Sequence, residues 1–438
     1  MLDKLNSCSI AMIGDTNLTP TSFYPFVNND GKTNRRVYNF EPIIGLLVSF
    51  ITEKKIPKDF SFEAFKQQCL KALEDELSEP AASSILESVF FPKDAIPTFS
   101  LLLFQAHIPD AKSNKVFHVF KLMMKQDNYQ ITFDTKLNFL ESRIVKQLKQ
   151  ELIDDKHGDQ TVSYLPYLDN LFTKDVAFLA KNTHYFTQHA ENFLKLYLFL
   201  YNSQLALNLH PHTFESPKSR PLYFILNYEK ASTERKRLVD SGYRALFDHA
   251  KYIFPYLSFL ETLIKITNMP DLRLYQLPEL LDDTPETACV LFGLEKKFRN
   301  ARKLPPVSSL IERATLEEAL KGLLNSAHEQ FHDLSSRKEI FENYLRAFER
   351  QAAEPFLLGR KRFGKVLVLE QDIILLLTNI AIQERKQMRF QELMSEFNQR
   401  GIYFDQQSQN ELIELYERVG NIERKSDSGD AVYVKTTL

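Results

Sequence analysis

Apolar residues recur at three- and four-residue spacing along most of the chain, which is the spacing of one face of an α-helix. The pattern begins after Glu41 and is clear at Phe62, Phe65, Cys69 and Leu73. It predicts helices over 136–152, 169–180, 184–209, 232–266, 311–334 and 337–351. Pro255 is expected to kink or split the helix over 232–266. The predicted fold class is mainly α, with an irregular helical body.

Turn-forming residues divide the chain. Pairs such as Thr19-Pro20 and Tyr24-Pro25 predict an irregular N-terminal segment over residues 1–40. A proline-rich connector at His210–Pro217 separates a helical domain from a second helical region. The predicted domains after the N-terminal segment cover 41–210, 211–355 and 356–438.

The final eighty residues show a different pattern. A short β-like run at Lys365–Leu369 precedes a helix through 373–380 and a second helix through 390–397, after which Gly401 suits a helix end. Ser408, with Glu411 three residues on, resembles a capping box for a third helix. Two strands, 422–425 and 431–434, come next with a turn between them. This order predicts a C-terminal winged helix-turn-helix (α+β) domain.

Composition narrows the class of protein. The 438 residues carry 55 basic and 57 acidic side chains, so the net charge of −2 argues against a purely electrostatic nucleic-acid binder. Only 12 glycines and three separated cysteines, Cys8, Cys69 and Cys289, argue against glycine-rich nucleotide loops and a disulfide framework. The longest uncharged apolar run, Ile43–Thr52, is about half of a membrane span. These features predict a cytoplasmic protein without a membrane segment.

One short motif suggests metal chemistry. His328, Glu329 and His332 form the HExxH pattern, in which two histidines one helical turn apart bind Zn²⁺ and the glutamate activates a water molecule. Both histidines are expected at the edge of a buried helical stripe, and charged Asp333 follows the second one. Two boundary histidines on an amphipathic helix are the preferred interpretation, so neither a metal nor another cofactor is predicted. A zinc-dependent hydrolase remains the alternative.

A second motif fails as a nucleotide loop. The stretch from Gly359 to Val366 lacks the hydroxyl residue of the phosphate-loop pattern, and a β-like run follows where a helix is required. Its basic residues form a candidate DNA-backbone contact or an ordinary solvated turn: Arg360, Lys361, Arg362 and Lys365.

Other basic residues are candidates for DNA binding. One cluster holds Lys296, Lys297, Arg299, Arg302 and Lys303. Another is Arg235–Arg237, and the predicted wing adds Arg424 and Lys425. The outward face of the third C-terminal helix is acidic, with three glutamates against Arg418, which disfavours base readout by this helix. The charge pattern therefore fits protein docking at least as well as contact with double-stranded DNA.

The C-terminal segment resembles a known family. The strings Val368–Asp372, Leu375–Asn379, Arg400–Asp405, Gly420–Glu423 and Ser426–Val434 are similar to the C-terminal part of the DNA phosphorothioation-dependent restriction protein DptG (DndG) family. The resemblance covers under a fifth of the chain. It implies a subunit of a bacterial phage-defence module that acts beside a P-loop ATPase subunit and a helicase-like subunit. It identifies no catalytic residue.

These observations favour a non-catalytic adaptor that scaffolds ATPase and helicase partners and assists DNA engagement. Two alternatives remain open. One is the zinc hydrolase, and the other is a stand-alone winged-helix DNA-binding regulator.

Overall fold

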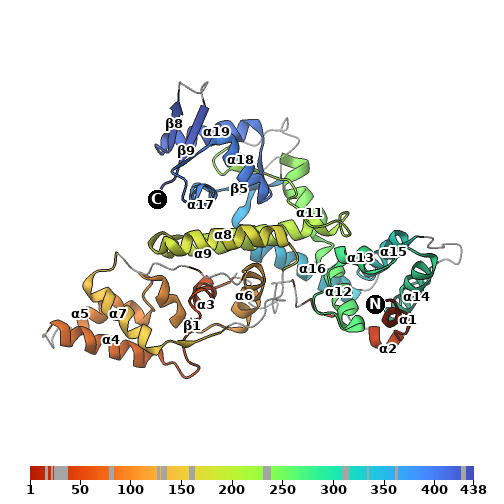
Figure 1. Cartoon of the computed structure of the whole chain (residues 1–438), viewed down its shortest axis with the longest axis horizontal. Coiled ribbons are helices and arrows are strands. Elements are labelled where there is room, and N and C mark those ends of the chain that lie inside the picture. Colours follow the sequence, from red (N-terminus) through yellow and green to blue (C-terminus); the bar gives the residue numbers. More distant parts are fainter. Residues whose placement is uncertain are drawn as a thin grey trace.

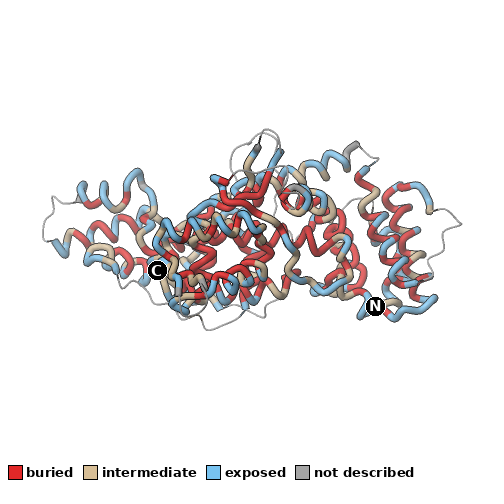
Figure 2. The backbone as a smooth tube through the Cα atoms, turned by 90° about the horizontal axis from the view of Figure 1, so that it is seen from above, coloured by how far each residue is buried: buried red, intermediate tan, exposed pale blue. Residues whose placement is uncertain are grey.

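The computed structural model describes most of the chain: residues 1–14, 18–20, 23, 38–77, 83–125, 129, 136–156, 163–229, 238–307, 315–332, 335–360, 364–425 and 431–438. Helices dominate these ranges, and their strands form small sheets. The predicted mainly α fold class is confirmed. Figure 2 shows buried residues extending through the elongated molecule, with exposed positions on its outside.

A long helix lies at the centre of the molecule (Figure 1). This helix, α9 (Thr183–Leu209), packs against α8 (Pro166–Lys181) and contacts elements from every part of the chain. Its second half is buried on all sides. Phe172 of α8 stacks on Phe193 of α9 with ring centroids 5.6 Å apart. Both helices were predicted from periodicity and are confirmed, because each carries its own apolar stripe.

The helices between residues 40 and 151 form a lobe below α9 in Figure 1. Helix α3 packs so closely on η3 that a Cβ at Gly45 would lie 2.2 Å from the carbonyl oxygen of Phe104. The predicted stripe on α4 is buried at Phe65, Cys69 and Leu73. The elements are α3 (Phe40–Thr52), β1 (Lys54–Lys55), α4 (Phe62–Leu77), α5 (Ser83–Phe90), η2 (Pro92–Asp94), η3 (Leu101–Ala106), α6 (Ala111–Met123), α7 (Phe139–Glu151) and β2 (Ile153–Asp154).

Two short helices near the N-terminus lie at the opposite end of the molecule from α4, beside the helices that come after α11 (Figure 1). They are α1 (Leu2–Asn6) and α2 (Ile10–Ile13). The Lys4 ammonium group donates to the carbonyl oxygen of Thr267 at 2.6 Å, which ties α1 to α12. Residues 2–6 and 10–13 are therefore helical, whereas the sequence predicted an irregular segment there. Leu5 and Ile13 are buried there, because α12 and α14 supply an apolar surface that local sequence does not reveal.

The helix predicted over 232–266 is divided, as Pro255 suggested. Pro255 lies in the first turn of α12, where its missing N–H costs no helical hydrogen bond. The elements of this region are η4 (Val239–Tyr243), α11 (Arg244–Ala250), α12 (Ile253–Thr267), η5 (Leu274–Gln276), α13 (Leu277–Leu280), α14 (Pro285–Ala301), α15 (Leu316–Glu329), α16 (Ser335–Phe348), η6 (Glu349–Ala353) and η7 (Glu354–Phe356).

A four-stranded sheet joins distant parts of the chain. Its strand order is β4-β5-β3-β7, formed by β4 (Leu357–Arg360), β5 (Gly364–Leu369), β3 (Leu222–Leu226) and β7 (Ile402–Phe404). Strand β3 runs parallel to both of its neighbours, and its buried side chains face the core. A strand from the second helical region therefore lies between two strands of the C-terminal segment.

The C-terminal helices and hairpin lie where the sequence predicts them. The elements are α17 (Gln371–Ile382), β6 (Gln387–Arg389), α18 (Phe390–Gln399), α19 (Gln406–Arg418), β8 (Ile422–Lys425) and β9 (Ala431–Lys435). Strands β6, β9 and β8 form an antiparallel sheet in that order. Helix α19 begins earlier than expected, because Asp405 rather than Ser408 is its N-cap and accepts from the Ser408 N–H at 2.9 Å.

The boundaries predicted at 210/211 and 355/356 stay predictions, and the four-stranded sheet crosses the second of them. No helix in the described ranges has both the length and the apolar character that crossing a bilayer requires.

Candidate functional site

The acid of the HExxH motif is bound to an arginine. The two carboxylate oxygens of Glu329 accept from the Arg299 guanidinium at 2.6 and 3.1 Å. The same guanidinium donates to the Ser326 hydroxyl at 3.0 Å and to the carbonyl oxygen of Pro305 at 2.6 Å. The ion pair between Glu329 and Arg299 thus joins α15 to α14. A carboxylate engaged in this way is not available to accept a proton from a metal-bound water.

The two histidines of the motif lie among aromatic rings. The His328 ring is 4.6 Å from that of His332 and 4.7 Å from that of Tyr252, between ring centroids. Burial, with a smaller contribution from His332, lowers the pKa of His328 to about 4. Within the described ranges, no group of three histidine, cysteine or acidic side chains is placed to hold a metal ion. The structure thus gives the zinc hydrolase alternative no support.

The basic cluster on α14 does not form one surface. Arg299 and Arg302 are 8% and 1% exposed, so neither is available to a phosphate backbone. Their prediction as DNA contacts is wrong, because the helix turns these two side chains inward and Glu329 neutralises Arg299. The Lys297 ammonium group donates to the carbonyl oxygen of Asn6 at 2.9 Å, which attaches α1. Lys296 and Lys303 are exposed.

The basic loop before β5 is only partly described. Lys361 and Arg362 lie outside the described residues, as does the cluster Arg235–Arg237. Arg360 ends β4, and its backbone pairs with Gly364. Lys365 forms an ion pair with Glu349, so its charge is shared with η6. Strand β5 begins at Gly364, one residue before the predicted β-like run, so a strand rather than a helix follows this loop.

The predicted wing and third helix carry paired charges. Arg424 of β8 forms an ion pair with Glu417 of α19 at 2.5 Å. Arg418 donates to the Tyr228 hydroxyl at 2.8 Å. Lys425 ends β8. Glu414 remains exposed on the same helix. Pairing with Arg424 neutralises Glu417, so the negative charge that remains on this face is that of Glu411 and Glu414, which disfavours a phosphate backbone as its binding partner.

Sequence reasoning missed the strongest contact of the C-terminal segment. Arg400 and Asp175 of α8 form a buried ion pair, 1% and 0% exposed, with guanidinium–carboxylate distances of 2.8, 2.9 and 3.2 Å. The Tyr197 hydroxyl also donates to Asp175. Burial lowers the pKa of Arg400, but attraction to Asp175 outweighs it and raises that pKa above its ordinary value. No local signal could identify this pair, since its members are 225 residues apart.

The glycine after Arg400 is required by its surroundings. Gly401 has φ +86°, and a Cβ there would lie 2.0 Å from the side-chain nitrogen of Gln204 on α9. The Gln204 amide donates to the carbonyl oxygen of Arg220 at 2.9 Å and accepts from its N–H at 2.8 Å. Asn208 binds Lys218 in the same two-way manner, at 3.0 and 3.1 Å. These two amides fix the chain that leads into β3.

A second buried acid holds α19. Glu229 accepts from the Ser408 hydroxyl at 2.8 and 3.1 Å, and from the backbone N–H of Leu226 at 3.1 Å. Ser408, expected to cap α19, therefore anchors this helix to the end of β3 instead. The segment Arg400–Asp405 is one of the segments on which the family resemblance rests. In this fold its residues contact α8, α9 and β3, so its role here is structural.

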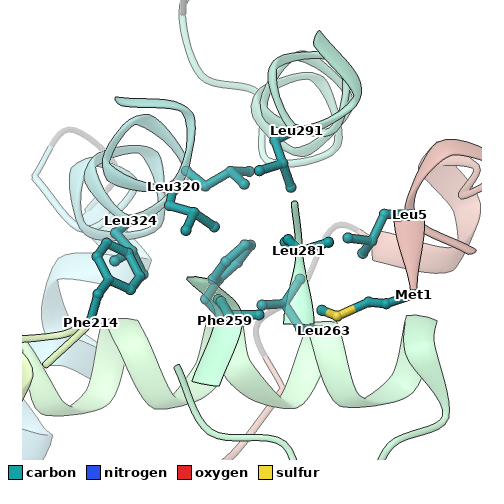
Figure 3. A pocket seen from close by; sticks show the side chains of 11 residues that line it. Met1, Leu5, Phe214, Phe259, Leu263, Leu281, Leu291, Leu320 and Leu324 are labelled. Carbon is teal, nitrogen blue, oxygen red and sulfur yellow. The ribbon is translucent and has the colours of Figure 1, made fainter. Parts of the chain in front are cut away.

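An apolar gap lies between α1 and the helices α12, α14 and α15 (Figure 3). Met1, Leu5, Phe259, Leu291 and Leu324 point into it, and its volume is about 10 Å³. That volume is at the lower limit for one water molecule. The gap is part of the core rather than a ligand site.

Comparison of the chain with protein-family models and with curated proteins found no significant match.

Proposed function

We propose that this protein is a non-catalytic subunit of a bacterial phosphorothioation-dependent restriction complex. It acts in the cytoplasm as a scaffold for a P-loop ATPase subunit and a helicase-like subunit, and it helps the complex to engage DNA. The observation that supports the proposal is the C-terminal order α17, β6, α18, β7, α19 and the β8-β9 hairpin, with sheet order β6-β9-β8. This order is similar to that of a winged helix except for β7, which pairs with β3 in the other sheet, and the resemblance of this same segment supplies the biological system.

The charges of α19 favour a protein rather than DNA as the partner of this helix. Glu414 is exposed, and Glu417 and Arg424 neutralise each other across the surface. A helix that reads DNA presents Arg, Asn or Gln to base edges and tolerates little negative charge. A basic surface on a partner subunit complements Glu414 and its neighbour Glu411.

The attachment of the C-terminal segment also suits a scaffold. Arg400 binds Asp175 of α8, and β3 pairs with both β5 and β7. A partner bound on α19 is thereby held in a fixed position relative to α9 and the helices on either side of it. A rigid connection of this kind suits an adaptor, because a flexible linker would not fix the positions of the two partners relative to each other.

The test is a pull-down of the tagged full-length chain from its native host, with mass spectrometry of the captured proteins and sequencing of any captured nucleic acid. We expect an ATPase with a phosphate-binding loop and a helicase-like protein in stoichiometric amounts. The variant Glu411→Lys/Glu414→Lys should lose at least one of them, because it reverses the charge of the proposed docking face.

Asp75→Lys is the matched control, since Asp75 is an exposed acid on α4, in the lobe on the other side of α9. It should capture both partners as the unmodified chain does. Capture of DNA without either protein would favour a stand-alone DNA-binding regulator. Nuclease or ATPase turnover by the pure chain would contradict a non-catalytic role.

A further inference from the structure

A pocket of about 490 Å³ lies in the lobe below α9, where α3, η3 and α6 meet the chain just after β2. Its size is that of a small-molecule site. None of the candidate site residues of the sequence analysis lines it. Its lining residues lie within 45–156, outside the C-terminal segment, so ligand binding there is a property separate from the proposed function.

The floor of the pocket is built by close helix packing. Gly45 allows α3 to approach the carbonyl oxygen of Phe104, and Gly45 itself lines the pocket. Phe50 and Phe117 contribute apolar lining, and their ring centroids lie 6.4 Å apart. The apolar wall of the pocket therefore includes two aromatic rings in an edge-to-face arrangement, against which a planar ring can pack.

A buried amide lines this floor with its orientation fixed. Gln105 is 3% exposed, and its nitrogen donates to the Thr52 hydroxyl at 3.0 Å. That hydroxyl donates its own proton to the carbonyl oxygen of Val48 at 2.7 Å, so it can only accept from Gln105. Gln105 Oε1 is thereby set as an acceptor, and it has no hydrogen-bond partner among the described residues. A buried acceptor of this kind favours a ligand that brings an N–H or O–H.

A second acceptor stands near Gln105. His107 Nδ1 faces the carboxylate of Glu41 at 3.6 Å, which places the proton of the neutral ring on Nδ1 and leaves Nε2 as an acceptor. Burial lowers the pKa of His107, against a smaller opposing effect of Glu41, so the neutral ring predominates near pH 7. His107 Nε2 is buried without a partner in the described part of the chain.

The charged side chains of the lining are mostly lysines. Three lysines, Lys55, Lys121 and Lys156, face one carboxylate, Asp155. Asp155 is already bound to Lys55 at 2.5 Å. Two ammonium groups therefore remain to attract an anion, and Lys156 lies just beyond β2 while Lys121 lies on α6. Charge-assisted hydrogen bonds from lysine are a common means of holding phosphate.

We propose that this pocket binds a nucleotide. Its phosphate is held by Lys121 and Lys156, its base packs on the apolar wall, and an N–H or O–H of the base or ribose donates to Gln105. A single ligand then pairs with the lysines, packs on the apolar wall and donates a hydrogen bond to the buried acceptor. No bond is made or broken, so the site is a binding site rather than a catalytic one.

The test is isothermal titration calorimetry of the full chain with AMP, GMP, CMP and UMP, beside ribose 5-phosphate and inorganic phosphate. We expect at least one nucleotide to bind, and inorganic phosphate to bind at least tenfold more weakly. The variant Lys121→Gln/Lys156→Gln should weaken nucleotide binding at least tenfold, which is the effect of losing one charge-assisted hydrogen bond or more. Gln105→Met should weaken the nucleotide that binds best and leave inorganic phosphate unaffected.

Lys112→Gln is the matched control, because Lys112 is exposed on α6 but does not line the pocket. It should bind nucleotide as the unmodified chain does, and circular dichroism should give every variant the same helix content. Absence of nucleotide binding at millimolar concentration would overturn the proposal. So would equal affinity for inorganic phosphate and nucleotide, or unchanged affinity in the double variant.

Discussion

Buried polar side chains hold this fold together at the level of single residues. Asp169 of α8 is 2% exposed, and the Ser163 hydroxyl donates to it at 2.5 Å. Burial raises the pKa of Asp169 to about 7, although its hydrogen bonds with Ser163 act in the opposite direction. Because this pKa is higher in the folded protein than in the unfolded chain, Asp169 lowers the stability of the protein as pH rises.

We predict that the unmodified protein loses stability between pH 5 and pH 7, and that Asp169→Asn abolishes this loss. In that range the unfolded chain has already released the Asp169 proton, because the ordinary pKa is 3.8, while the folded chain still holds it. The free energy of unfolding contributed by Asp169 therefore falls as pH rises toward 7, by about 2–3 kcal/mol. Urea unfolding of both proteins at the two pH values measures the difference.

Asp75→Asn, at an exposed position on α4, is the control and should follow the pH dependence of the unmodified chain. If the difference between Asp169→Asn and the unmodified chain is the same at both pH values, the carboxyl is ionised throughout and the prediction fails.

At the scale of elements, two glycines end the two C-terminal helices α18 and α19. Gly401 and Gly420 have φ of +86° and +75°, so both have left-handed backbone. They differ in their neighbours: a Cβ at Gly401 would collide with Gln204, whereas nothing lies within 4 Å of one at Gly420. The pair separates the cost of the backbone conformation from the cost of close packing on α9.

We predict that Gly420→Ala lowers the free energy of unfolding by about 1–2 kcal/mol, which is the cost of a left-handed alanine. Gly401→Ala should cost more by a further 1–3 kcal/mol or so, because Gln204 must move and give up its hydrogen bonds with Arg220. Thermal and urea unfolding of the two variants give this difference directly. Equal costs would mean that Gln204 moves aside freely.

The elements that the sequence predicted are those whose signal is local. The periodicity of α4, α8 and α9 and the order of α17, α18, α19, β8 and β9 are confirmed, since each depends on neighbouring residues. Strand β3 was missed because a five-residue apolar run does not distinguish a strand from a helix, and its partners lie far along the chain.

The candidate site was harder to predict for the same reason. The local density of basic residues predicted that Arg299 and Arg302 lie on the surface, yet both are buried. Arg400 drew attention only through the resemblance, because its partner Asp175 is 225 residues away. Nothing in the sequence around Gln105 predicts a binding role. Its side-chain oxygen is left without a hydrogen-bond partner among the described residues because of the way α3, η3 and α6 pack together.

For the whole molecule, the Arg400–Asp175 pair is the test of how the C-terminal segment is joined to the body. We predict that Arg400→Met lowers the free energy of unfolding by about 3–5 kcal/mol, because it leaves the buried Asp175 carboxyl group without its ion-pair partner. Urea unfolding followed by circular dichroism and tyrosine fluorescence measures the loss, since the chain has no Trp.

Asp175→Asn/Arg400→Met is the companion variant, in which no uncompensated charge remains and Tyr197 keeps an acceptor. It should be less destabilised than the sum of the two single changes, by at least about 1 kcal/mol. A purely additive result would show that the two side chains do not stabilise each other.

The position of β3 has a consequence for synthesis of the protein in the cell. Its residues, Leu222–Leu226, leave the ribosome well before β5 (Gly364–Leu369) and β7 (Ile402–Phe404), between which they lie in the finished molecule. Until β5 has been made at residue 369 this strand lacks both of its partners, and until β7 has been made at residue 404 one of its edges stays open to other chains. Completion of the central sheet is therefore a late event that comes after translation of the C-terminal segment. Chaperones that shield nascent chains should matter most for this stretch.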